Sequence, residues 1–137
     1  MAIQEMGSEI EDEFVKSIKK NYESLNNNEN FKEQFKDKTF KILLNPKDGK
    51  FAALISVDQG SVSVHGMKNT PKEDISKVMV GWDGYMQTTR QTFREIGDGT
   101  LSSKDVRKRF LMRKIKGKGL EYLRYLSQMS ALRRDIE

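Results

Sequence analysis

The sequence predicts an α+β domain in which a five-stranded, mainly antiparallel sheet carries helices packed on one face. Two observations predict it. Apolar residues follow a helical period near both ends of the chain, and they alternate with polar residues over 39–67. Since an apolar sheet face cannot stay exposed, the helices must cover it. The chain has 137 residues and no cysteine, so it has the length of one domain and needs no disulfides to bury a core.

The N-terminal part predicts a helix over residues 9–26. Ser8 and Glu11 fit a capping box, in which two side chains satisfy the free N–H groups of the first turn. The apolar positions that follow the helical period are Ile10, Phe14, Ile18 and Tyr22. Phe31 and Phe35 indicate one more short helical stretch.

The period then changes to two, which predicts an antiparallel meander. In its first strand Phe40, Ile42 and Leu44 share one face. Pro46 and Gly49 supply turn chemistry after this strand, and the segment 58–61 turns the chain again. The expected strands of the meander are 39–45, 50–58 and 61–67.

The second half of the chain completes the element order as strand, helix, strand, helix. Between the second helix and the last strand, Ser102 or Ser103 caps a further short helix. The glycines of "GKG" at 117–119 then break the last strand. The expected elements are a strand at 75–80, a helix at 82–96, a strand at 110–116 and a helix at 118–132. We therefore divide the chain into an N-terminal tail (1–8), a single domain (9–132) and a C-terminal tail (133–137).

The helix expected at 118–132 has an unusually wide apolar surface. At about 100° per residue, its apolar positions span an arc of roughly 240°, whereas a surface helix needs little more than about 100°. Three arrangements would use this surface. The helix is sandwiched between other elements, it pairs with a second copy of the chain, or it closes over a hydrophobic ligand.

Positive charge gathers near the C-terminus. The net charge is +5, and residues 104–137 hold eleven Lys/Arg against four Asp/Glu. Such a segment attracts anions, which include nucleic acid, membrane headgroups and phosphorylated ligands.

The sequence shows little that is typical of a catalytic site. His65 is the only histidine, and no cysteine is present to pair with it. The sequence contains no metal-ligand spacing and no phosphate-binding loop motif. We expect neither an enzyme nor a bound metal or cofactor. The chain has no apolar run of about 20 residues and no hydrophobic signal core, so we expect a cytoplasmic protein.

Three stretches resemble the sterol carrier protein 2 (SCP2) family, and they occur in the family's order. They are "VDQGSVSVHG" (57–66), "ISKVMVGWDGYMQTTRQTFREIGDGTL" (75–101) and "RFLMRKIKGKGLEYLRYLSQM" (109–129). The resemblance implies a five-stranded sheet with helices on one face. It also implies an apolar tunnel for sterols, fatty acids or fatty acyl-CoA, in a carrier that is not a catalyst.

A lipid-binding interpretation accounts for the wide final helix and for the methionines, which make an adaptable apolar lining. A few polar groups then orient the ligand, and basic residues hold an anionic headgroup or CoA phosphates. The candidate ligand-binding residues are Phe51, Ile55, Trp82, Tyr85, Met86, Thr89, Phe93, Met112, Leu123, Tyr125, Leu126 and Met129. The candidate headgroup residues are Arg113, Lys114, Lys116 and Lys118.

An RNA-binding module is the alternative, with the basic segment 104–118 as its contact surface. Phe110 lies among these basic residues, as in an RNA-binding strand, but no second aromatic completes a stacking platform. We rank nucleic acid below a lipid or acyl-CoA ligand as a partner. An anionic membrane surface and a second copy of the chain are further candidate partners.

Overall fold

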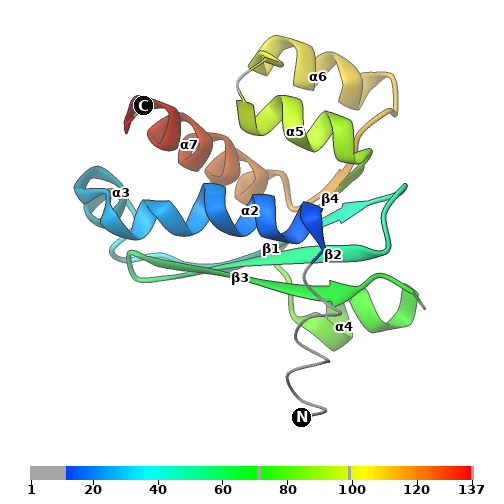
Figure 1. The fold of residues 1–137 in the computed structure, drawn as a ribbon, viewed down its shortest axis with the longest axis horizontal. Coiled ribbons are helices and arrows are strands. Elements are labelled where there is room, and N and C mark those ends of the chain that lie inside the picture. Colours follow the sequence, from blue (N-terminus) through cyan, green and yellow to red (C-terminus); the bar gives the residue numbers. More distant parts are fainter. Residues whose placement is uncertain (1–11, 71, 99, 137) are drawn as a thin grey trace.

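The computed structural model describes residues 12–70, 72–98 and 100–136. This part of the chain contains a five-stranded sheet with the order β3-β2-β1-β4-β5 (Figure 1). Its strands are β1 (Thr39–Pro46), β2 (Phe51–Asp58), β3 (Ser61–Lys68), β4 (Gly84–Thr88) and β5 (Lys116–Lys118). β1 and β4 pair in parallel, and the other neighbours pair antiparallel. The predicted five-stranded, mainly antiparallel sheet is therefore confirmed.

Helices cover one face of this sheet, as predicted. Figure 1 shows α2, α3, α5, α6 and α7 on one side of the strands and the short α4 on the other. The helical segments are α2 (Glu13–Glu23), η1 (Ser24–Asn27), α3 (Glu29–Gln34), η2 (Lys72–Ile75), α4 (Lys77–Val80), α5 (Arg90–Asp98), α6 (Ser103–Leu111) and α7 (Leu120–Ile136).

The sheet separates two apolar clusters. The larger one lies under the helices, where Ile42 and Ile55 of the sheet pack with Phe14 of α2 and Met129 of α7. The smaller one lies on the opposite face, which we call the outer face. There Leu43, Ala52 and Leu54 are covered by Ile75 and Trp82. The second half of β1 is consequently buried on both faces.

The predicted first helix and meander are confirmed. α2 begins after Asp12, whose Oδ1 accepts a hydrogen bond from the N–H of Val15 at 3.0 Å. The capping box at Ser8 and Glu11 and the tail at 1–8 lie outside the described residues. The division of the chain into tails and a domain stays a prediction.

Side chains from the end of the first helical segment protect the free edge of β3. Asn26 donates through Nδ2 to the carbonyl of Val62 and accepts from the N–H of Val62, both at 2.8 Å. Glu23 accepts from the N–H of Val64 at 2.9 Å. These bonds satisfy backbone groups that would otherwise offer a pairing edge to another chain.

The strand predicted at 75–80 is wrong, because local capping signals form a helical turn there instead. The Oγ of Ser76 accepts from the N–H of Met79 at 3.3 Å, and Gly81 ends the turn with a φ of 76°. Val78 is 93% exposed. The apolar residues of this segment therefore do not mark a buried strand.

The helix predicted at 82–96 is wrong in its first half, where β4 takes its place. β4 pairs in parallel with β1, and only residues 90–98 are helical. Gly84 is needed at this position because a Cβ there would lie 2.9 Å from the Cβ of Tyr122 in α7. The local sequence pattern of this segment favours a helix. Its pairing with β1 and its packing under α7 stabilise a strand instead.

The strand predicted at 110–116 is also wrong. The predicted short helix is confirmed, with Ser102 rather than Ser103 as its cap, but it continues through Leu111 as α6. Arg113 then turns the chain with a φ of 59°, and the fifth strand is limited to 116–118. α7 begins at Leu120 and runs to Ile136, past the predicted boundary at 132.

Candidate functional site

An apolar groove lies between the α5–α6 hairpin and α7, with β4 at its floor. Its volume is about 480 Å³. Eight of its thirteen lining residues are apolar. The lining consists of Met86, Ile96, Leu101, Ser102, Val106, Arg107, Phe110, Leu120, Leu123, Arg124, Leu126, Ser127 and Ser130. We call this feature the groove. Leu120 is 66% exposed, so apolar surface of the groove is open to solvent.

Local sequence signals build the α6 wall of the groove. The Oγ of Ser102 accepts from the N–H of Asp105 at 3.1 Å, and Asp105 accepts from the N–H of Ser102 at 3.4 Å. This reciprocal capping fixes the start of α6. Val106 and Phe110, four residues apart, then lie on the same side of the helix and line the groove.

Polar contacts hold α6 against α5. Arg109 donates through Nη1 to the Oγ1 of Thr92 at 3.1 Å and to Glu95 at 3.3 Å. Thr89 in turn accepts from the N–H of Thr92 at 3.1 Å and so caps α5. The N–H of Arg90 donates to Asp48, which lowers the pKa of that carboxyl group. These contacts fix the hairpin that forms one side of the groove.

The sheet edge at β5 has no side chain on the groove side. Gly117 pairs with Met86 and faces the helices. A Cβ on Gly117 would lie 2.7 Å from Cε1 of Phe110 and 2.8 Å from Cδ1 of Leu123. The glycine therefore allows these two side chains to close the bottom of the groove over the sheet.

The wide apolar arc of α7 is used on two sides. Leu123 and Leu126 line the groove. Tyr125 faces the core, where its ring centroid lies 5.9 Å from that of Phe35 and 5.1 Å from that of Phe40. One side of α7 therefore packs within its own chain, and the other side lines the groove.

Three of the twelve candidate ligand-binding residues line the groove, namely Met86, Leu123 and Leu126. The others lie elsewhere. Those that belong to or pack against the cluster under the helices, outside the groove lining, are Phe51, Ile55, Phe93, Tyr125 and Met129. Thr89 caps α5.

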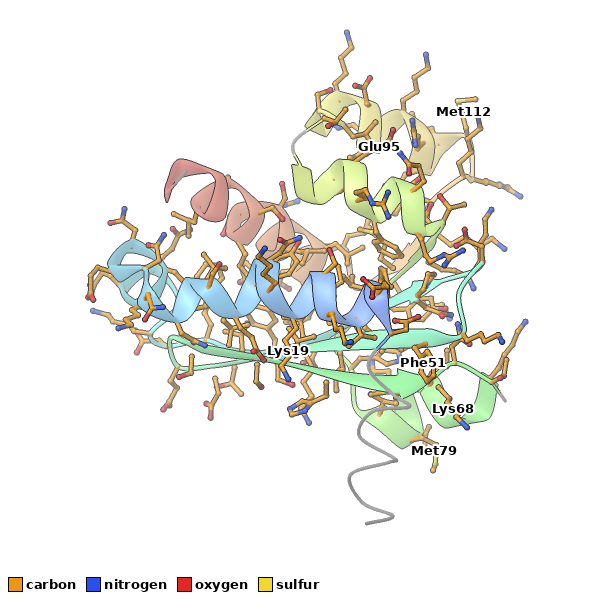
Figure 2. The ribbon with its side chains drawn as sticks, viewed as in Figure 1. Lys19, Phe51, Lys68, Met79, Glu95 and Met112 are labelled. Carbon is orange, nitrogen blue, oxygen red and sulfur yellow. The ribbon has the colours of Figure 1, made fainter. Side chains whose placement is uncertain are left out.

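Trp82 and Tyr85 are separated from the groove by the sheet. Their rings pack against each other on the outer face, at a centroid distance of 5.2 Å. Met112 is 53% exposed, and Figure 2 shows it at the outer end of α6. In the helix predicted at 82–96, Trp82, Tyr85, Met86 and Phe93 would form one apolar stripe. They do not share one surface, because residues 84–88 are a strand whose successive side chains alternate between faces.

None of the four candidate headgroup residues lines the groove. By the β4–β5 register, Lys118 is opposite Tyr85 and Lys116 is opposite Gln87, so both lysines lie on the outer face. Arg113 and Lys114 are exposed in the turn after α6. The cations that do line the groove are Arg107 and Arg124.

Sequence reasoning missed the α6 contribution to the groove. The signal was present in the four-residue spacing of Val106 and Phe110 behind a capping serine. This spacing was not used as a helix signal, because a strand was expected from residue 110 onward and Phe110 was therefore assigned to the wrong element.

Other kinds of site have little support in the described residues. Within 12–70, 72–98 and 100–136, no group of three or more His, Cys, Asp or Glu side chains could hold a metal ion. His65 is exposed on β3, and its Nε2 lies 3.5 Å from the Oγ of Ser63. No described helix is both long enough and apolar enough to cross a membrane.

No family model and no curated protein matches the sequence. Solved structures do match its fold. The ubiquinone synthesis protein UbiJ-SCP2 has a TM-score of 0.60 at 8% identity, over 88% of this chain and 90% of that one. A conserved hypothetical protein of Thermus thermophilus, described as a candidate sterol carrier protein, has a TM-score of 0.56 at 11% identity, over 93% and 88%. Sterol carrier protein 2 of Yarrowia lipolytica, in its apo form, has a TM-score of 0.55 at 16% identity, over 90% and 95%.

Proposed function

We propose that this chain, which has the SCP2-like fold, binds a hydrophobic ligand with an anionic headgroup in the groove and carries it without catalysis. The observation that carries the proposal is the apolar lining of the groove, which continues from the edge of the packed core to the solvent-exposed Leu120. Its volume of about 480 Å³ falls within the range of about 300–1,000 Å³ that is usual for small-molecule sites. Fatty acids, fatty acyl-CoA and sterol-like lipids are the candidate ligand classes.

Arg107 and Arg124 supply the headgroup contact in this proposal. Arg107 extends from α6 and Arg124 from α7, so the two guanidinium groups belong to opposite walls. No acidic side chain is among the described residues that line the groove. Guanidinium groups bind carboxylates and phosphates through paired hydrogen bonds. We therefore replace the lysine-rich headgroup site predicted from the sequence with this arginine pair.

The double substitution Arg107→Gln and Arg124→Gln tests both parts of the proposal. Wild-type protein should bind palmitate, and should keep that binding in high salt because apolar burial is not screened. The variant should bind palmitate about three- to tenfold more weakly, since exposed charge pairs contribute little each. Its affinity for hexadecanol, which has the same chain without the charge, should not change. Isothermal titration calorimetry measures both ligands.

Lys116→Gln with Lys118→Gln is the matched control, because it removes two charges from the outer face. An equal loss of palmitate affinity in this control would mean that net charge, rather than the arginine pair, attracts the ligand. Absence of palmitate binding by the wild-type protein would refute the proposed function itself.

The RNA-binding alternative has less support once the side chains are in place. Phe110, the aromatic residue of the basic segment, packs against the cluster under the helices and lines the groove. Its ring is therefore turned toward the protein rather than offered to a base. Saturable RNA binding that collapses with salt, in a protein that binds no lipid, would reverse this ranking.

We further propose that the end of α6 contacts an anionic membrane surface. Leu111 is 82% exposed and Met112 is 53% exposed. Lys108, Arg113 and Lys114 lie within a few residues of them and are exposed. Apolar side chains surrounded by cations suit insertion among anionic headgroups. Phe110, which lines the groove, directly precedes Leu111 in the sequence. Membrane contact through Leu111 would therefore place the α6 wall of the groove close to the lipids.

Leu111→Ser with Met112→Ser should reduce cosedimentation with vesicles that contain phosphatidylserine, by about fivefold or more, because both apolar contacts are lost. Palmitate affinity should not change. Val78→Ser with Met79→Ser is the matched control, since these residues of α4 are 93% and 68% exposed. Figure 2 shows Met79 and Met112 on opposite sides of the sheet. If the control lowers vesicle binding as much, the contact is not specific to α6.

The cytoplasmic location and the second copy of the chain as a partner stay predictions. The apolar residues of α7 that face the groove are assigned to the ligand in this proposal, so they give no separate support for a dimer.

A further inference from the structure

A second, smaller pocket lies on the outer face of the sheet. Its volume is about 250 Å³, which is below the range for drug-sized ligands. Tyr85 of β4 faces this pocket, and its neighbour Met86 faces the groove. The sheet therefore separates the two sites. We call this feature the outer pocket.

A buried hydrogen-bond chain orients one wall of the outer pocket. Asn69 is 9% exposed and donates through Nδ2 to the carbonyl oxygens of Pro46 at 3.3 Å and Gly49 at 2.9 Å. Carbonyl oxygens only accept, so these contacts fix which end of the Asn69 amide is the donor. The same Nδ2 lies 3.0 Å from the Oδ1 of Asn45. This contact makes the oxygen of Asn45 the acceptor and leaves its Nδ2 to donate onward.

Asn45, which is 5% exposed, donates through that Nδ2 to the hydroxyl oxygen of Tyr85 at 2.9 Å. The oxygen of Tyr85 is thus used as an acceptor, and its O–H has no acceptor among the described residues. The Oγ of Ser76 likewise accepts from the N–H of Met79, and its O–H has no described acceptor. Since neither proton has an acceptor in the described part of the chain, both can donate to a ligand.

The charged groups described in the lining of the outer pocket are both cationic. Lys72 and Lys118 line it, and no carboxylate is among the described residues of the lining. Every hydroxyl and ammonium group there can donate a hydrogen bond. Trp82 lies in the same wall, where it is 8% exposed and packs against Tyr85. Hydrogen-bond donors and cations around one small pocket favour the binding of a small oxyanion. The neighbouring indole ring favours an oxyanion that bears an organic substituent.

We propose that the outer pocket binds a small phosphate-class anion, either inorganic phosphate or a phosphate monoester. Tyr85, Ser76, Lys72 and Lys118 donate to its oxygens, and the substituent of a monoester contacts the accessible edge of Trp82. The proposal is independent of the groove, because the two sites lie on opposite faces of the sheet.

Trp82 is the only tryptophan in the chain, so its fluorescence reports directly on the outer pocket. Titration of the full chain with inorganic phosphate and with phenyl phosphate, at constant ionic strength, should give a saturable change in emission. Phenyl phosphate should bind more tightly, because its ring adds a contact. Chloride at the same ionic strength should give no saturable change. A wild-type protein that shows no saturable response to either phosphate would overturn the proposal.

Tyr85→Phe keeps the ring and removes the donor, so phosphate affinity should fall about fivefold, as expected for one hydrogen bond. Lys118→Gln should weaken binding as well and does not touch the Asn45 network. Tyr122→Phe, on the helix side of the sheet, should leave the affinity unchanged. Unchanged affinity in both Tyr85→Phe and Lys118→Gln would mean that phosphate binds elsewhere. Palmitate affinity should be measured for the same variants. It tests the groove proposal, so a failure of phosphate binding can be distinguished from a failure of lipid binding.

Discussion

Gly119→Ala is expected to lower the free energy of unfolding by roughly 2–4 kcal/mol. Gly119 has a φ of 69°, a conformation that costs a residue with a Cβ about 1–2 kcal/mol. A Cβ would also overlap the carbonyl oxygen of Asp83 and lie 3.1 Å from the Cα of Gly84. Both are backbone atoms of the segment that begins β4, so they cannot move aside as a side chain could. Urea denaturation followed by circular dichroism measures the loss.

Gly81→Ala provides a matched control for the backbone term. Gly81 has a φ of 76°, but a Cβ there would have no atom within 4 Å. The control should therefore cost only the conformational strain of about 1–2 kcal/mol. Equal losses in the two variants would show that the close approach of Gly119 to Asp83 does not constrain the fold.

The glycines at 117 and 119 thus have different physical roles, although the sequence offers them as one flexible turn. Gly117 gives space to Phe110 and Leu123 above the sheet edge. Gly119 turns the chain between β5 and α7, and its carbonyl accepts from the N–H groups of Tyr122 at 2.9 Å and Leu123 at 3.2 Å. The turn is a packed junction between strand and helix.

The parts of the fold that the sequence predicts well are those where local pattern and burial agree. Phe40, Ile42 and Leu44 alternate in the sequence and lie in one cluster under the helices. In the first helix, Phe14 and Ile18 are likewise periodic and buried. Such segments can be predicted because the contacts that stabilise them coincide with their intrinsic preferences.

Longer-range contacts determine the parts that were predicted wrongly. In β4, Gly84 and the polar side chain of Gln87 weaken the sequence pattern of a strand. The strand forms because it pairs with β1. β5 has only three residues, two of them lysines, so no apolar alternation marks it. The groove depends on both segments. Leu123 and Leu126, on its α7 side, were predicted from the sequence. The residues on its α6 side could be predicted only if the helix was known to continue through Leu111.

Ser127→Trp is expected to reduce palmitate affinity at least about tenfold, with little change in stability. Ser127 is exposed and lines the groove from α7, on the same wall as Arg124 and one turn further along the helix. An indole ring at this position would occupy the space of the acyl chain without displacing a core side chain. Surface substitutions of this kind usually change the free energy of unfolding by about 0.5 kcal/mol or less. Calorimetry with palmitate and urea denaturation measure the two quantities.

Glu121→Trp is the matched control, because it introduces the same ring on the same helix. Residues 121 and 127 are about 120° apart around α7, and Glu121 is exposed outside the groove lining. Its palmitate affinity should equal that of the wild-type protein. If Ser127→Trp folds normally and binds palmitate as tightly as the control does, the acyl chain does not lie in the groove. A large stability loss in Ser127→Trp would instead show that the groove is closed by packed side chains, in which case Ile96→Ala, on the opposite wall, should restore both stability and binding.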